Sequence, residues 1–332
     1  MLYRRTLIAA AGAIPLIRPV RAAGLEKATL RMDWALSGYQ VPFYWAKAQG
    51  YYEAEGIDLD ILDGAGSSKS AQLVAAKQDT FGLADALVTV NSIAKGMKLK
   101  SVFVVVQDGG SAIVSWEKTA FRKPQDMIGH SVAGAAEQRS WLELLLAVNG
   151  IPKDAVKVRI VSVAARNQVF YQHEVDGIIS TVIGSPMDMI VAAKEGRGDP
   201  IYIMPFSDFG VKSMTTGVIV HQDTATAKPD LVRRFVRASI KALAEIVDPA
   251  KADAATDAAM KLSNAPPIRR ESVKLQWLAT LPRLQVAETK SKPLGWTNDT
   301  EWQECVDLLL KTGQMEAPIA VPGLYTNGFI PA

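Results

Sequence analysis

The chain has 332 residues, of which 48% are hydrophobic and 21% are charged, with 24 Gly, 17 Pro and one Cys. These figures exclude a disordered chain, which would have fewer apolar residues and more net charge, and a collagen-like or low-complexity chain, which would have far more Gly and Pro. The formal net charge of +3 does not indicate a nucleic-acid or membrane-surface partner, because residues 1–22 hold four Arg and no acid, which leaves 33 of the 37 basic residues against 34 acidic ones.

The first 22 residues predict a secretory signal. The basic segment Met1–Arg5 precedes a small apolar segment, Thr6–Ile17, and Val20-Arg21-Ala22 places small side chains at the two positions that a signal peptidase recognises. The apolar segment is shorter than the ~20 residues that span a bilayer. We expect export by the general or the twin-arginine pathway, cleavage near Ala22 and a periplasmic mature protein that is not inserted in the membrane. The alternative is a buried N-terminal helix.

Strands and helices alternate in the next part of the chain. The predicted strands are Thr29–Met32, Ile57–Leu62, Phe81–Ala84 and Ser101–Val106. The predicted helices are Pro42–Gln49, Ser67–Lys77 and Ala86–Lys95. This order is typical of a mostly parallel sheet covered by helices, and a chain of this length tends to divide because single cores stop growing at about 250–300 residues.

The pattern restarts after Asp108-Gly109-Gly110 and later crosses back. The restarted part has strands at Ala112–Trp116, Ser131–Gly134, Val156–Val161, Gly177–Ser180 and Ile201–Met204, and helical segments at Pro124–Ile128, Glu137–Val148 and Ser185–Lys194. A further strand at Gly217–His221 and a long amphipathic helix from Pro229 follow the crossing. We expect a signal peptide at 1–22, a first lobe at 23–110, a second lobe at 111–206 and a return to the first lobe at 207–332.

A glycine- and serine-rich segment, Gly64–Ser70, follows a predicted strand and opens a helix. It lacks the Gly-Lys-Ser/Thr order of a P-loop and the third glycine of a dinucleotide fingerprint, so it does not predict nucleotide binding. Glycines allow close backbone approach, and the N–H groups at a helix start attract acceptor groups. Gly66, Ser67 and Ser68 are therefore candidate ligand contacts, and the alternative is a plain turn with a helix cap.

No motif in the sequence predicts an enzyme. The three His lie far apart, and the single Cys305 permits neither a disulfide nor a thiolate metal cluster, so we expect no metal and no cofactor. Three segments follow the order of the penicillin-recognising motifs: Ser92–Lys95, Ser207–Phe209 and Lys311–Gly313. Because Ser92 lies late in its helix and the second segment lacks its Asn, a serine acyl-transferase or hydrolase is only a remote alternative.

Aromatic and acidic side chains gather where predicted strands end. Four aromatic residues follow the first strand: Trp34, Tyr39, Phe43 and Tyr44. Four acids come just after a strand or at a lobe crossing: Asp85, Asp108, Glu137 and Asp208. Ligands of open α/β sheets bind beyond the carboxyl ends of the strands, and an aromatic wall with a few polar groups is typical of a small-molecule cleft. Each acid taken alone fits a helix cap or a solvated loop, but their placement together favours a cleft.

Several segments, in their order along the chain, resemble one family of solute-binding proteins of ABC importers, which includes binders of thiamine pyrimidine precursors, alkanesulfonates and nitrate. The segments that carry the resemblance are Met32-Asp33-Trp34, Val41–Lys47, Gly50–Leu59, Gly66-Ser67-Ser68, Val74–Asp85, Gly96-Met97-Lys98, Lys123–Val132, Gly150-Ile151, Val175-Asp176-Gly177 and Lys228–Phe235. The resemblance covers nearly the whole mature chain. It departs from the family at Gln78, where Gly or Lys is usual, and at His130, where Lys is usual.

The resemblance implies an α/β fold of the type II periplasmic binding proteins, with two lobes, two crossover segments and a cleft that closes on solute. It also implies a monomer without enzymatic activity that delivers a small molecule to an ABC importer permease and its ATPase. The site residues implied in the two lobes are Trp34, Gln40, Phe43, Ser67, Ser68, Asp85, Glu137, Gly184 and Ser185, with Asp108 and Asp208 beside the hinge. Tyr39, Gly66 and Arg139 complete the predicted site.

Two classes of ligand stay open at this point. The carboxylates and a stacking Trp34 favour a neutral or amine-bearing heterocycle, such as an aminopyrimidine that pairs with Asp85 or Glu137. The helix start at Ser67, together with Arg139, would instead suit a sulfonate, an aromatic carboxylate or nitrate. Eukaryotic proteins of the same fold are single-turnover synthases of the thiamine pyrimidine, but they carry a cysteine-rich motif, so the one Cys of this chain does not support that activity.

Overall fold

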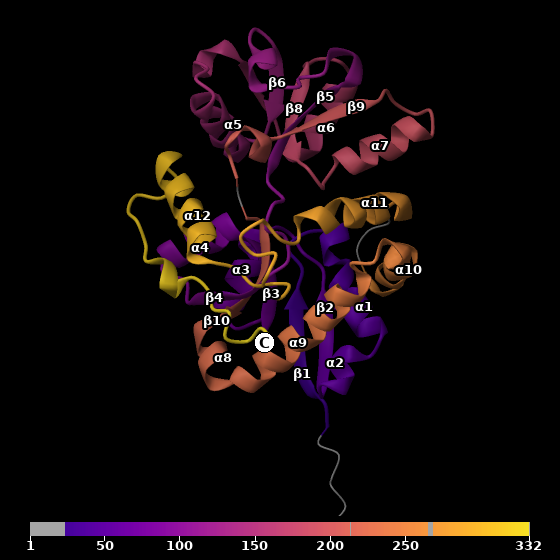
Figure 1. Ribbon diagram of the computed structural model, residues 1–332, viewed down its shortest axis with the longest axis vertical. Coiled ribbons are helices and arrows are strands. Elements are labelled where there is room, and N and C mark those ends of the chain that lie inside the picture. The colour runs from indigo at the N-terminus through magenta and orange to yellow at the C-terminus, as the bar shows by residue number, and fades with distance from the viewer. Residues whose placement is uncertain (1–23, 213, 265–267, 332) are drawn as a thin grey trace, which may run out of the picture.

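The computed structural model describes residues 24–212, 214–264 and 268–331, and within them the chain forms two five-stranded sheets in two lobes. Figure 1 shows the second lobe above the first, with helices on both sheets. The predicted signal peptide lies outside the described residues. The α/β, two-lobed architecture that the sequence predicts is therefore confirmed.

The first sheet has the strand order β2-β1-β3-β10-β4. Its strands are β1 (Glu26–Arg31), β2 (Ile57–Leu62), β3 (Phe81–Asp85), β4 (Leu99–Val104) and β10 (Thr216–His221). β1 pairs in parallel with β2 and β3, whereas β10 runs antiparallel to β3 and β4. The sheet is therefore mixed, with one reversed strand that the chain adds after it has built the second lobe.

Helices cover both faces of the first sheet, as the alternation along β10 shows. Val218 and Val220 join an apolar cluster that contains Phe43 and Phe235, whereas Ile219 between them joins a separate cluster with Val74. The first cluster packs under α1 (Val41–Ala48), α2 (Tyr51–Ala54) and α9 (Pro229–Ile246), and the second under α3 (Ser67–Ala75), beside α4 (Ala86–Ala94). A mostly parallel sheet of this kind is stable because helices keep both faces dry.

The second sheet has the order β7-β6-β8-β5-β9. Its strands are β5 (Ser111–Trp116), β6 (Ser131–Gly134), β7 (Lys157–Ile160), β8 (Gly177–Thr181) and β9 (Ile201–Pro205), and its helices are α5 (Ala136–Val148), α6 (Val163–Tyr171) and α7 (Pro186–Lys194). β6 pairs in parallel with β7 and β8, and β5 runs antiparallel to β8 and β9. The strands of this sheet begin at residue 111 and end at residue 205, while the lobe boundaries proposed from the sequence stay a prediction.

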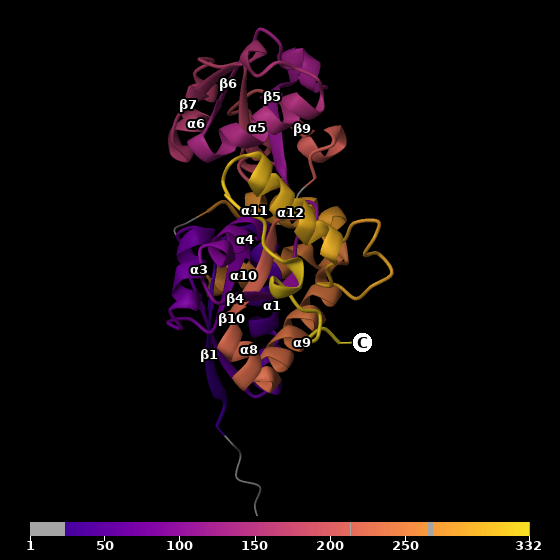
Figure 2. The ribbon, with the colours of Figure 1, turned by 90° about the vertical axis from the view of Figure 1, so that its left-hand side faces the viewer.

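The last part of the chain returns to the first lobe as helices. These are α8 (Gln222–Ala227), α9, α10 (Ala252–Leu262), α11 (Arg270–Thr280) and α12 (Asp299–Lys311). In both Figure 1 and Figure 2, α11 and α12 lie at the level between the two lobes. An ion pair links the start of α11 to the second lobe: Arg269 Nη1, just before α11, lies 3.4 Å from Glu195 Oε2 at the end of α7.

The predicted elements recur within a few residues of their bounds, but three helices were not predicted: α2, α6 and α8. The buried stripe of α6 consists of Arg166, Val169 and Phe170 at helical spacing. A charged residue in the first position of that stripe hides the apolar periodicity by which a helix is recognised. The omission matters, because Arg166 belongs to the functional site described below.

Two crossover segments join the lobes, and their described residues are 105–110 in the first and 206–212 with 214–215 in the second. In the second lobe Ser111, where β5 begins, pairs with Thr181, where β8 ends. In the first lobe Thr216, where β10 begins, pairs with Asp85, where β3 ends. Both crossovers therefore connect the carboxyl edges of the two sheets, and these edges lie on the facing sides of the lobes, where α/β folds bind ligands.

Candidate functional site

The carboxyl edge of the first sheet brings together the residues after β1, the start of α3 and the end of β3. The backbone N–H of Gly66 donates to the carbonyl of Asp33 over 2.7 Å. The Ser67 hydroxyl accepts from the backbone N–H of Asp85 over 3.1 Å. These two bonds fix Asp33, Gly66, Ser67 and Asp85 in one place, although they are as many as 52 positions apart in the chain.

Gly64 permits this convergence because the backbone directly after β1 passes against it. An added Cβ would lie 2.3 Å from the backbone nitrogen of Trp34 and 2.4 Å from the carbonyl oxygen of Met32. Real side chains do not tolerate such contacts with backbone atoms. A side chain at position 64 must therefore move the segment that carries Trp34.

We expect Gly64→Ala to lower the free energy of unfolding by about 1–3 kcal/mol, the usual cost of overpacking. Urea unfolding followed by circular dichroism measures the change. Gly323→Ala is the matched control, because a Cβ there would meet no atom within 4 Å and should change stability by less than ~0.5 kcal/mol. Equal stability of the two variants would contradict the close approach at Gly64.

Asp33 is a buried carboxylate that braces the turn before Trp34. Its oxygens accept from the Tyr39 hydroxyl at 3.0 Å and from the Gln40 amide at 3.0 Å. Burial raises the pKa of Asp33 and, together with the Asp33 charge, raises the pKa of Tyr39 well above its usual range. Gln40 also accepts from Ser37 N–H and donates to the Trp34 carbonyl. The predicted site residues Tyr39 and Gln40 thus hold the loop, and Gln40 is fully buried.

Asp85 ends β3 and caps α4, accepting from the Leu87 N–H at 2.8 Å. Burial raises the pKa of Asp85 from its usual 3.8 to about 7, and the Asp33 charge adds to the shift. The side chain is half-buried. Asp85 is thus a carboxyl group that changes charge near neutral pH at the edge of the sheet, which is a property typical of functional sites.

The aromatic residues of the predicted wall divide between surface and core. Trp34 is 53% exposed, so its ring is available to a ligand. Phe43 is completely buried, with its ring edge-on to Phe103 and stacked on Phe235, and Tyr44 is buried as well. The stacking role predicted for Phe43 is not compatible with this position, because α1 turns that ring into the core.

A buried arginine occupies the facing edge of the second sheet. Arg166, near the start of α6, is 4% exposed. Its guanidinium donates to the Ile179 carbonyl at 2.8 Å and to the Ser185 hydroxyl at 2.9 Å, and it lies 3.4 Å from Gln138 Oε1. It therefore joins the starts of α5, α6 and α7 at one point. Sequence reasoning missed Arg166, and a capping Ser162 directly before its helix is the signal that could have revealed it.

The other residues predicted for the second lobe lie around this arginine or away from it. Gly184 and Ser185 are half-buried at the start of α7, where Ser185 also approaches Ser180. Arg139 is on the exposed side of α5 and pairs with Glu143 at 2.8 Å. The arginine that lies at the buried edge of the second sheet is therefore Arg166 and not the predicted Arg139. Glu137 lies in the first turn of α5, but its side chain is outside the described residues.

The remaining predicted residues lie at the hinge or on the surface. Ser68 is exposed at the start of α3. Asp108 lies in the first crossover, where its side chain and carbonyl both accept from Arg283. Asp208 is exposed in a short 3-10 helix of the second crossover, Phe206–Phe209. The structure therefore brings together Trp34, Gly66, Ser67 and Asp85 in one lobe and Gly184 with Ser185 in the other, but not Asp108 and Asp208.

No group of three or more His, Cys, Asp or Glu within the described residues has the arrangement to hold a metal ion. In the same part of the chain, no helix combines the length and the apolarity that crossing a membrane requires.

Two α/β lobes, joined by two crossovers at facing carboxyl edges, define the fold class of the periplasmic binding proteins. A solved structure with this fold is the putative periplasmic sulfonate-binding protein SsuA from Methylobacillus flagellatus. It aligns with a TM-score of 0.68 over 92% of this chain and 93% of its own, at 13% identity. The likeness shows that the two molecules share the fold.

The chain belongs to the NMT1/THI5 like family, whose model matches residues 37–252. The family predicted from the order of the motifs is thereby confirmed. The riboflavin-binding protein RibY of Chloroflexus aurantiacus is 26% identical over 315 residues, which span 92% of this chain and 87% of RibY. A 4-amino-5-hydroxymethyl-2-methylpyrimidine phosphate synthase of Legionella pneumophila is 21% identical over 217 residues, 64% of this chain and 67% of the synthase.

Proposed function

We propose that this protein is the solute-binding component of an ABC importer and that it captures a small, planar, amine-bearing heterocycle between its lobes. The observation that carries the proposal is that the exposed ring of Trp34 and the carboxyl group of Asp85 belong to the same sheet edge, the one that faces the second lobe. An aromatic face favours a flat ligand, and a carboxylate accepts hydrogen bonds from an amine. One relative is named as a riboflavin-binding protein and the other as a synthase of an aminopyrimidine phosphate. Both names support a nitrogen heterocycle as the ligand.

The charges of the first lobe favour the heterocycle over an anion. At the start of α3 the Gly66 N–H donates to the Asp33 carbonyl and the Ser67 hydroxyl accepts from the Asp85 N–H, so two acidic residues adjoin this helix start. A sulfonate bound here would be repelled by these acids whenever they are ionised. Arg139, which the anion hypothesis requires, is paired with Glu143 on the exposed side of α5.

Arg166 supports a second candidate, an organic anion such as a sulfonate or an aromatic carboxylate. A guanidinium with Ser185 beside it, at the meeting point of three helix starts, is a suitable environment for an anionic group. This candidate places the ligand mainly against the second lobe. The heterocycle places it mainly against Trp34, so the two candidates predict different sensitive residues.

Binding without turnover fits the side chains near the cleft. Cys305 is completely buried in α12, and burial raises the pKa of its thiol well above the usual range, so it is neither accessible nor a ready nucleophile. Ser92, the serine of the remote hydrolase hypothesis, is 7% exposed in the later turns of α4. Export to the periplasm, delivery to a permease and a monomeric state complete the proposal.

A thermal-shift screen of the mature protein tests this function. The panel contains aminopyrimidines, flavins, alkanesulfonates, nitrate and aromatic carboxylates. A ligand at 100-fold its dissociation constant should add ~2.7 kcal/mol to the free energy of unfolding. A shift with a heterocycle supports the main candidate. A shift only with anions, abolished by Arg166→Gln and kept by Trp34→Ala, would establish the second candidate. A solute that is chemically converted rather than released intact would contradict a binding protein.

A further inference from the structure

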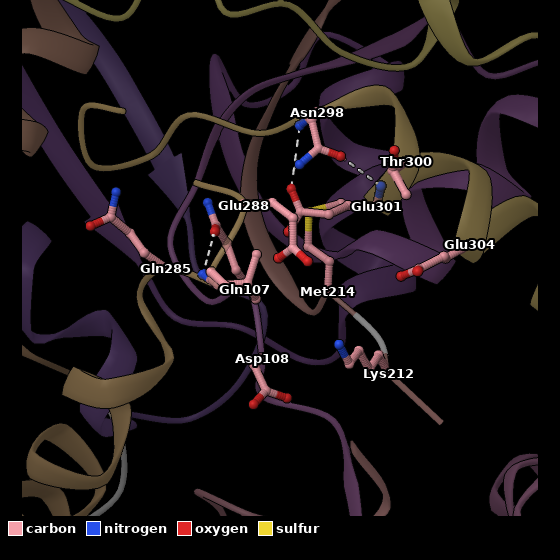
Figure 3. A pocket seen from close by; sticks show the side chains of 12 residues that line it. Gln107, Asp108, Lys212, Met214, Gln285, Glu288, Asn298, Thr300, Glu301 and Glu304 are labelled. Atoms are coloured by element: carbon pink, nitrogen blue, oxygen red, sulfur yellow. Dashed lines mark hydrogen bonds between the residues drawn. The ribbon is translucent and has the colours of Figure 1, made fainter. Parts of the chain in front are cut away.

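A cavity of about 250 Å³ lies at the hinge, apart from the edges that carry Trp34 and Arg166. Figure 3 shows the side chains that line it. They come from both crossovers, through Asp108 and Lys212, and from the C-terminal part of the chain, through Glu288 and the first turns of α12. Neither the family nor the proposed function assigns a role to this cavity.

Glu301 is the buried acid of the cavity, with 8% of its surface exposed. Its Oε2 accepts from the Thr297 hydroxyl at 3.0 Å and from the Asn298 N–H at 3.3 Å, as part of the cap that starts α12. Its Oε1 is buried and has no hydrogen-bond partner within the described residues. A buried acceptor left without a partner destabilises the fold, more so if it is charged. A ligand that supplies a donor there would recover this energy.

The charges around Glu301 are predominantly negative. Glu304 follows it on α12, Glu288 faces it from the segment before α12, and Asp108 and Lys212 line the cavity from the two crossovers. Asp108 is neutralised by Arg283. Burial, with the charges of Glu304 and Glu288, raises the pKa of Glu301 to about 7. Lys212 is thus the one cation lining the cavity in the described part of the chain, against three glutamates.

The rest of the lining suits a short hydrocarbon chain. Met214, whose sulfur lies 3.4 Å from the Thr297 hydroxyl oxygen, and Val286 are apolar walls of the cavity. The apolar walls and the acid together match an alkyl stem that ends in a cation. An inorganic ion is a poorer match, because no group of at least three His, Cys, Asp or Glu among the described residues has the arrangement of a metal site.

We propose that the hinge cavity binds a small organic cation, a primary ammonium on a short alkyl stem, with Glu301 as its charge partner. The ammonium donates to Glu301 and Glu304, and the stem packs on Met214 and Val286. Because both crossovers line the cavity, the cation contacts the two segments that must rotate when the lobes close. The site is therefore placed to influence closure without touching the solute in the cleft.

Isothermal titration calorimetry of the mature protein with n-butylammonium chloride tests the proposal. We expect saturable binding that weakens at least tenfold in Glu301→Gln, which keeps the shape and removes the charge. Glu316→Gln, at an exposed acid outside the cavity, is the matched control and should bind as the parent does. Asp85→Asn should also bind as the parent does, which separates this site from the cleft and from the proposed function.

A second variant and a second ligand keep the test decisive if Glu301→Gln unfolds. Thr300→Lys, at the exposed rim of the cavity, places a lysine ammonium beside the glutamates. This competing charge should weaken the binding of n-butylammonium about tenfold. n-Butanol has the same stem without the charge, and we expect no binding. Affinity for n-butylammonium should also rise about tenfold from pH 6 to pH 8, as Glu301 ionises. Absence of saturable binding, equal binding of n-butanol, or undiminished binding in both variants would overturn the proposal.

Discussion

Replacement of Trp34 by alanine is expected to weaken the binding of a heterocyclic ligand by about 10- to 100-fold. Stacking of a nucleobase-like ring on an aromatic side chain contributes about 1–3 kcal/mol, and Trp34 offers an exposed aromatic face at the sheet edge that carries Asp85. Its ring is 53% exposed, so removing it leaves no cavity in the core and should hardly change stability. The ligand found in the thermal-shift screen is titrated by calorimetry to measure the loss.

Two matched variants show whether the effect belongs to stacking at this position. Trp34→Phe keeps an aromatic face and should lose less than half of the binding free energy that the alanine variant loses. Tyr171→Ala removes another exposed aromatic residue, 42% exposed at the end of α6, and should bind as the parent does. Undiminished binding in Trp34→Ala would remove Trp34 from the site and favour the anion at Arg166.

Asp85→Asn is expected to abolish the pH dependence of heterocycle binding and to weaken binding at pH 8 by at least tenfold. The pKa of Asp85 is about 7, so a ligand amine that needs the carboxylate loses about tenfold in affinity per pH unit below that value. The asparagine side chain keeps the helix-cap acceptor for the Leu87 N–H but carries no charge to attract the amine. Calorimetric titrations at pH 5, 6, 7 and 8 give both profiles.

At pH 8, where Asp85→Asn should weaken ligand binding, the same substitution should raise the free energy of unfolding. At pH values between 3.8, the usual pKa of an aspartate, and about 7, its pKa in the folded protein, Asp85 holds its proton more tightly in the folded than in the unfolded state. Raising the pH through this window therefore lowers the free energy of unfolding, because the folded state must keep a poorly solvated charge. We expect Asp85→Asn to be more stable than the parent at pH 8 and equally stable at pH 4. A variant that is less stable at both pH values would show a purely structural role for Asp85.

The first-lobe half of the site could be predicted from sequence because its signals are local. A strand followed by Gly64-Ala65-Gly66-Ser67-Ser68 indicates a helix start, and Asp85 directly after an apolar strand indicates a cap at the same edge. Parallel strands bring such ends together whatever the rest of the chain does. The alternation of strands and helices predicted the two lobes for the same reason.

Side-chain direction could not be predicted, because it depends on tertiary packing. Trp34 and Phe43 are both aromatic residues near the end of β1, yet α1 buries Phe43 between Phe103 and Phe235 and leaves Trp34 outside. Arg166 is the opposite case, because a charged residue is expected at the surface but this one is buried. Its burial follows from acceptors on other elements, the Ile179 carbonyl and the Ser185 hydroxyl.

The reversed strand β10 has a consequence for the order in which the molecule can assemble on the ribosome. β3 and β4 do not pair with each other, since β10 lies between them, and β10 is the only described strand beside β4 in the sheet. Residues 216–221 emerge only after the entire second sheet, residues 111–205, has been synthesised. The second sheet can therefore complete its pairing first, whereas the first sheet stays in two pieces until the nascent chain is about two-thirds finished.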